Sequence, residues 1–140
     1  MTLLLASPPM RRAALVSLAL AALGVAGCSD ESGTFDDPHV PFTFALPAKF
    51  TKESVDRLNS RGDVVAVVAL DKVNAIGVRR VPATFLRTET KLRVLGDAVT
   101  SDVRPVSGAP GWALECQYTA ARRATMLDAC AEVARKLHHR

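Results

Sequence analysis

The sequence predicts an α+β fold: a small antiparallel sheet packed by one or two helices, over residues 40–140. Residues 63–70 (DVVAVVAL) are a nearly continuous apolar run that is typical of a strand covered on both faces. Residues 75–81 are predicted to form the returning strand of a hairpin, which makes the sheet antiparallel. Residues 126–137 repeat apolar side chains at the spacing of one helix face.

The chain begins with the three parts of an export signal. Arg11 and Arg12 supply a basic start, and residues 13–23 supply an apolar run that ends in small residues. A bilayer core needs about 20 apolar residues, so this run is too short to span it. Met1 precedes an apolar, proline-containing stretch that does not suit a basic start, and we therefore expect Met10 to be the true initiator.

Residues 25–28 (VAGC) resemble the bacterial lipobox. The resemblance implies cleavage before Cys28 and attachment of a diacylglyceryl group to its thiol. Residues 1–27 are then a lipoprotein signal peptide, and residues 28–39 are the lipidated cysteine and a flexible tether. Two acyl chains are enough for stable attachment, so we expect an extracytoplasmic protein anchored to the cell membrane by lipid. The alternatives are an ordinary cleaved signal or a single transmembrane helix, with Cys28 incidental.

Length and charge limit the remaining possibilities. Removing 27 of the 140 residues leaves 113, which is enough for one small domain. Loss of Arg11 and Arg12 leaves 16 basic and 14 acidic residues, a balance of +2. No cluster of Lys and Arg is interleaved with aromatic residues, so the sequence does not indicate a nucleic-acid partner.

The first part of the predicted domain consists of short elements. Residues 29–38 are polar and acidic, as expected of the tether. Residues 40–46 alternate apolar and polar side chains, which predicts a half-buried strand that Pro47 closes. Residues 48–60 contain a possible helical turn, and residues 71–74 form the turn of the hairpin.

Residues 82–95 fit two interpretations. Pro82 at a first helical turn and Gly96 as a C-terminal stop predict a helix that ends near Leu95. A strand is predicted instead by the residues at every second position: Thr88, Thr90, Leu92 and Val94. The sequence leaves both open.

The last two elements follow a turn at residues 107–111. In the strand of residues 112–119, one face carries Trp112, Leu114, Cys116 and Tyr118. In the helix that follows, Thr125 and Asp128 approximate a capping box, and cations lie near the C-terminal end. Its apolar stripe consists of Met126, Leu127, Cys130, Val133, Ala134 and Leu137.

Cys116 and Cys130 both point at the predicted core, in a compartment where disulfides persist. A disulfide between them would close a loop of about 15 residues and stabilise the fold by about 3 kcal/mol. The alternative is two buried thiols that act as small hydrophobic side chains.

Known catalytic and metal-binding patterns are missing from the sequence. The histidines are His39, at the end of the predicted tether, and His138 and His139, at the C-terminus. None lies in the interior of the predicted domain, where a general base would be needed. We therefore assign no catalytic residue, no metal ligand and no cofactor.

Three segments resemble small actinobacterial lipoproteins with a PsbP-like α/β fold: residues 41–52 (PFTFALPAKFTK), residues 64–81 (VVAVVALDKVNAIGVRRV) and residues 108–119 (GAPGWALECQYT). The resemblance implies helices packed on one antiparallel sheet, and it carries no catalytic residue to a position here. We expect a non-enzymatic envelope lipoprotein that binds a protein partner or a small apolar ligand near the membrane. The alternative is a lipid-anchored enzyme or an enzyme accessory subunit.

Overall fold

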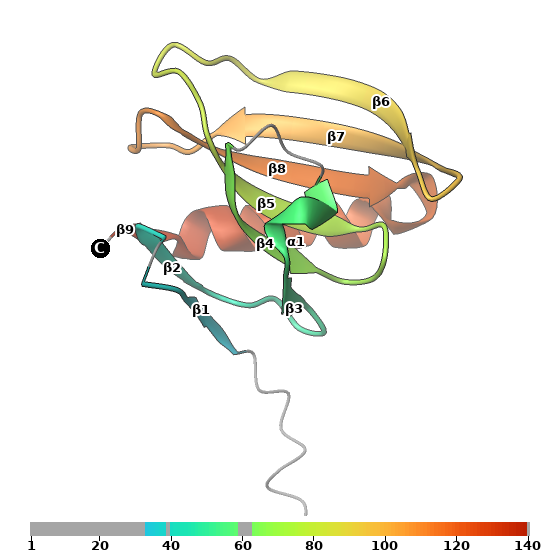
Figure 1. The fold of residues 1–140 in the computed structure, drawn as a ribbon, viewed down its shortest axis with the longest axis horizontal. Helices are drawn as coiled ribbons and strands as arrows, with labels where there is room; N and C mark the ends of the chain where they lie inside the picture. The colour runs from blue at the N-terminus through green and yellow to red at the C-terminus, as the bar shows by residue number, and fades with distance from the viewer. Residues whose placement is uncertain (1–32, 39, 59–62, 140) are drawn as a thin grey trace, which may run out of the picture.

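The computed structural model describes residues 33–38, 40–58 and 63–139 and shows two antiparallel sheets with one long helix (Figure 1). This confirms the predicted α+β fold. Sheet A has the strand order β1-β2-β9, and sheet B has the order β3-β4-β5-β8-β7-β6. In chain order the elements are β1 (Thr34–Asp36), β2 (Phe42–Ala45), β3 (Thr51–Glu53), η2 (Val55–Leu58), β4 (Val64–Ala69), β5 (Ala75–Arg80), β6 (Thr88–Val94), β7 (Asp97–Pro105), β8 (Trp112–Thr119), η3 (Ala120–Arg122), α1 (Arg123–Lys136) and β9 (His138–His139).

Helix α1 lies along one face of sheet B, where it contacts β8, and it also contacts β2 of sheet A (Figure 1). The main core fills the space between sheet A, sheet B and α1. Phe35 of β1 stacks on Phe44 of β2, with ring centroids 5.0 Å apart. Phe42 meets the ring of Trp112 edge-on at 4.8 Å, which joins sheet A to sheet B. Burial of these aromatic rings joins the N-terminal segment to the main core.

The opposite face of sheet B has a smaller cover. There the 3₁₀ helix η2, predicted as a helical turn within residues 48–60, places Leu58 over β4 and β5. The approach is close at Gly77, because a Cβ there would lie only 2.3 Å from Leu58 Cδ1. The predicted strands at residues 63–70 and 75–81 are confirmed as β4 and β5. Some of their buried residues face the side that α1 covers, and the others face Leu58 of η2.

The tether predicted for residues 28–39 is wrong in its C-terminal part. Residues Thr34–Asp36 form strand β1, which pairs with β2 from Thr34 opposite Ala45 to Asp36 opposite Thr43. Phe35 is only 2% exposed. One aromatic side chain in a polar segment is enough to hold it when a complementary strand edge lies beside it. The described fold therefore starts before residue 40.

The helix considered for residues 82–95 is also wrong, and the alternative strand is confirmed as β6. It pairs along its whole length with β7, a strand that the sequence analysis did not predict. Leu95 and Gly96 connect them with φ values of 50° and 85°. Two successive positive φ angles are the mark of a tight hairpin turn. Gly96 thus serves a hairpin and not the end of a helix.

The C-terminal helix is confirmed, but its predicted start is not. Helix α1 begins at Arg123, directly after η3, and Arg122 at its N-cap position has no side-chain capping bond. Thr125 is an exposed residue inside the helix, so the capping box does not form. Most of the apolar stripe faces the core as predicted, with Met126 and Val133 fully buried, but Ala134 of the predicted stripe is exposed.

Candidate functional site

The predicted disulfide between Cys116 and Cys130 is present. The S–S distance is 2.06 Å and the Cα atoms are 6.3 Å apart, which suits a disulfide. Both residues are buried. The bond joins the middle of β8 to the middle of α1, and it therefore fixes the helix on the sheet at this point.

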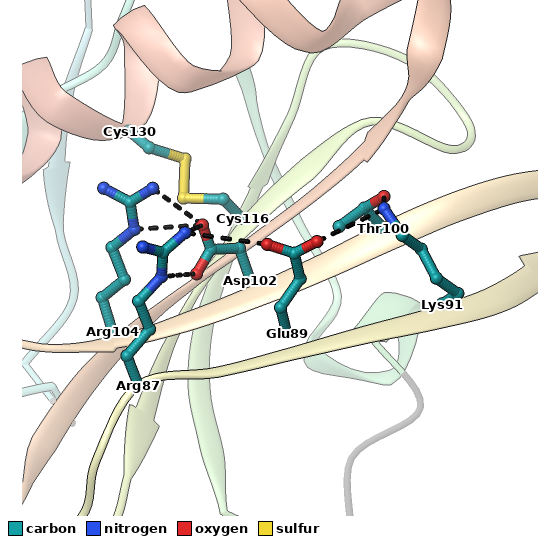
Figure 2. Close-up of polar contacts among 8 residues, drawn as sticks. All are labelled: Arg87, Glu89, Lys91, Thr100, Asp102, Arg104, Cys116 and Cys130. Carbon is teal, nitrogen blue, oxygen red and sulfur yellow. Dashed lines mark hydrogen bonds and ion pairs between the residues drawn. A yellow bond between two sulfur atoms is a disulfide. The ribbon is translucent and has the colours of Figure 1, made fainter.

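Asp102 lies next to the disulfide. In the register of β7 and β8 it is opposite Cys116, which places its side chain on the face that α1 covers. The residue is 0% exposed. Figure 2 shows its carboxylate beside the guanidinium groups of Arg87 and Arg104. Arg104 donates from Nε and Nη2 to Oδ2 at 3.0 and 2.7 Å. Arg87 donates from Nε to Oδ1 and from Nη2 to Oδ2, both at 3.0 Å.

The hydrogen bonds keep Asp102 ionised. Burial alone would raise the pKa of this carboxyl, because it disfavours the charged form, but the hydrogen bonds from Arg104 and Arg87 outweigh burial and lower the pKa. The hydrogen bonds to Asp102 in turn raise the pKa of Arg87. Asp102 and Arg87 are therefore both charged at neutral pH.

We call Arg87, Glu89, Lys91, Asp102 and Arg104 the Asp102 cluster. Lys91 contacts Glu89 at 3.3 Å and donates to Thr100 at 2.6 Å, which extends the polar row along β6 and β7 (Figure 2). Three cations and two carboxylates give the cluster a net charge of +1. The side chains of Arg87 and Arg104 are 54% and 49% exposed. Within the described part of the chain, neither Nη1 group has a hydrogen-bond partner.

A pocket of about 170 Å³ lies between β7, β8 and α1, next to this cluster. We call it the β7–α1 pocket. The disulfide forms part of its wall, and most of the remaining lining is hydrocarbon. Of the described residues that line it, Arg104 alone is charged. The lining residues are Arg104, Pro105, Val106, Ser107, Leu114, Cys116, Leu127, Cys130, Ala131 and Ala134.

A wider hollow of about 520 Å³ lies on the opposite face of sheet B. Its buried polar groups bind one another. Glu115 accepts hydrogen bonds from Arg79 at 2.8 Å and from Ser101 at 2.6 Å, and Gln117 donates to the Val73 carbonyl at 2.8 Å. Because these groups already satisfy each other, we take this face as structural and the β7–α1 pocket as the candidate site.

The sequence analysis also considered Cys28 and the three histidines. Cys28 and His39 lie outside the described residues. His138 and His139 form β9, which pairs with β2 as a strand of sheet A. Within residues 33–38, 40–58 and 63–139, no group of three side chains is arranged to hold a metal ion. None of the described helices combines the length and apolar character of a membrane span.

Asp102, Arg87 and Arg104 are not among the residues that we assigned to a site from the sequence. A signal was present, because Asp102 and Arg104 are two residues apart and so share one face of a strand. The signal can be recognised only once β7 is known to pair with β6, because this pairing places Arg87, 15 residues away in the chain, beside Asp102. Comparisons with protein-family models, curated proteins and solved structures found no match for this chain. The assignment of the site therefore depends on its geometry.

Proposed function

We propose that this protein is a non-enzymatic envelope lipoprotein that binds a small apolar ligand in the β7–α1 pocket, close to the membrane that carries its lipid anchor. The observation that carries the proposal is the pocket itself, a hollow of about 170 Å³ with a mainly hydrocarbon lining. An apolar cavity of about 150 Å³ holds a benzene-sized molecule. Transfer of a ligand of that size out of water contributes about 25 cal/mol per Å² of apolar area.

The proposed anchor places this pocket near lipid. The lipobox-like residues 25–28 support attachment at Cys28, and β1 begins at Thr34. Extended chain spans at most about 3.6 Å per residue, so the intervening residues reach roughly 20 Å. The domain is thus held within a short distance of the bilayer, where apolar molecules concentrate. The resemblance to small actinobacterial lipoproteins agrees with this arrangement.

The non-enzymatic part of the proposal rests on the side chains available. In the described residues, the buried carboxylates of Asp102 and Glu115 are both held by arginines. A general acid or base needs a pKa near the working pH, and the pKa of Asp102 is instead lowered. The arrangement favours binding over proton transfer.

Toluene is a suitable probe for the pocket, because it is apolar, uncharged and close to the pocket in size. We expect it to shift the methyl NMR signals of Leu114 and Leu127 in the full chain carrying Cys28→Ser. Ala131→Leu places a larger side chain in the pocket and should abolish the shifts. Ala124→Leu, an exposed alanine of the same helix outside this pocket, is the control and should leave the shift of Leu114; Leu127 is not used in this control because it lies beside Ala124. Shifts that survive Ala131→Leu, or no shifts at all, would contradict ligand binding here.

A second candidate is a protein partner on the β6 edge of sheet B. Exposed large apolar side chains are spread along this edge: Leu86 before β6, Leu92 in it and Leu95 in the turn after it, with exposures of 79, 36 and 77%. An edge strand offers unpaired backbone groups to an added strand. A photo-crosslinker placed at Leu95 should then capture one partner in cells, whereas one at Ala124 should not. Equal labelling from both positions would count against this surface.

A further inference from the structure

We propose that the ligand of the β7–α1 pocket is a monocarboxylic acid, with its apolar group inside the pocket and its carboxylate on the guanidinium of Arg104. The inference depends on the ligand-binding function proposed above and adds the charge and chemical class of the ligand. The decisive feature is an arginine in the lining of a mainly hydrocarbon hollow, with its side chain half exposed and its guanidinium held by Asp102.

Asp102 holds the Arg104 guanidinium in place. Two hydrogen bonds to one carboxylate oxygen use Nε and Nη2. They leave Nη1, which has no partner among the described residues, as the available donor. A planar guanidinium fixed in this way loses little conformational freedom on binding a second anion. Arg104 can thus contact a ligand carboxylate while it keeps both bonds to Asp102, because the three nitrogen atoms point in different directions.

The charge around the pocket favours a monoanion. The Asp102 cluster has a net charge of +1, and none of the described lining residues is acidic. Ser107, also in the lining, offers a hydroxyl that can donate to the same carboxylate. A cationic ligand would be repelled, and a neutral ligand would leave these donors to water.

The size of the pocket limits the apolar part. About 170 Å³ accommodates one ring or a short branched alkyl group, and it is too small for a long acyl chain. The expected ligand is therefore a compact acid, such as an aryl-substituted propionate, and not a phospholipid or a long-chain fatty acid.

A matched pair of probes tests the inference. 3-Phenylpropionate and 3-phenylpropanamide have the same hydrocarbon part and differ in charge. We expect the acid to bind the full chain carrying Cys28→Ser about tenfold more tightly than the amide, as one hydrogen bond to a charged group provides. The methyl NMR signals of Leu114 and Leu127 report binding at this pocket.

Arg104→Met should bring the affinity ratio of acid to amide close to one. Arg93→Met removes a cation from the same hairpin outside the pocket and should leave the ratio near ten. If Arg104→Met does not fold, Arg104→Lys decides: a smaller ratio supports the guanidinium contact, and an unchanged ratio overturns it.

The outcomes separate the two proposals. Equal binding of acid and amide overturns the carboxylate inference and leaves the apolar pocket standing. No binding of the acid, the amide or toluene overturns ligand binding itself. A preference for the acid that disappears equally in Arg93→Met and Arg104→Met reflects general charge attraction and also overturns the inference.

Discussion

Removal of both arginines from Asp102 should destabilise the protein more than removal of the carboxylate itself. Asp102 is 0% exposed, whereas the two arginine side chains are about half exposed. In Arg87→Ala/Arg104→Ala the carboxylate remains buried without its cations, which costs about 3–5 kcal/mol. In Asp102→Asn the guanidinium groups turn to water, and the loss is that of hydrogen bonds to a charged group, about 1.5–3 kcal/mol.

The two variants should also differ in their dependence on pH. In the wild type the pKa of Asp102 is lowered. The carboxylate's contribution to the free energy of unfolding is therefore fully present above the unfolded-state pKa of about 4, and it is lost as the pH falls through the folded-state pKa. Without the arginines, burial raises this pKa above its unfolded value. The folded double variant then binds a proton more tightly than its unfolded chain does. The free energy of unfolding that it loses relative to wild type therefore shrinks as the pH falls from 7 towards 4.

Urea denaturation of the full chain carrying Cys28→Ser, followed through the single Trp112, measures these free energies at pH 7 and pH 5. The double variant should lose the most free energy of unfolding at pH 7 and should regain part of it at pH 5. Asp102→Asn should show nearly the same loss at both values. Equal losses for the two variants at pH 7, with no change at pH 5, would refute the view that the arginines compensate for a buried charge.

Three further predictions concern the anchor, the disulfide and the hairpin. Cys28→Ser should move the protein from the detergent phase to the aqueous phase in a two-phase partition, and unchanged partitioning would contradict lipid attachment. Alkylation should find Cys116 and Cys130 unreactive until reductant is added, and reduction should lower the free energy of unfolding by about 3 kcal/mol. Leu95→Asn should raise that free energy by a few tenths of a kcal/mol to about 1 kcal/mol, because asparagine tolerates the φ of 50° better than leucine. A lower denaturation midpoint for Leu95→Asn would show that contacts of the leucine outweigh its backbone strain.

Local patterns in the sequence were enough for the elements that carry most of the core. Alternation along residues 112–119 and the apolar stripe of the last helix identified the facing sides of β8 and α1. Cys116 and Cys130 could be paired for the same reason, since each lies on the buried side of its element. Period and burial are properties of neighbouring residues, so they can be read without knowledge of the fold.

Other features depended on contacts between distant segments. Residues Thr34–Asp36 are a strand only because β2 offers an edge, and residues Thr88–Val94 are a strand only because β7 lies beside them. The candidate site belongs to this second class. In the sequence, nothing distinguishes Asp102 from the other acidic residues. It becomes a buried carboxylate that binds two arginines once the register of β6, β7 and β8 places it on the face covered by α1. Strand pairing is a long-range choice among competing partners, and its energy is decided by side chains that the chain brings together only on folding.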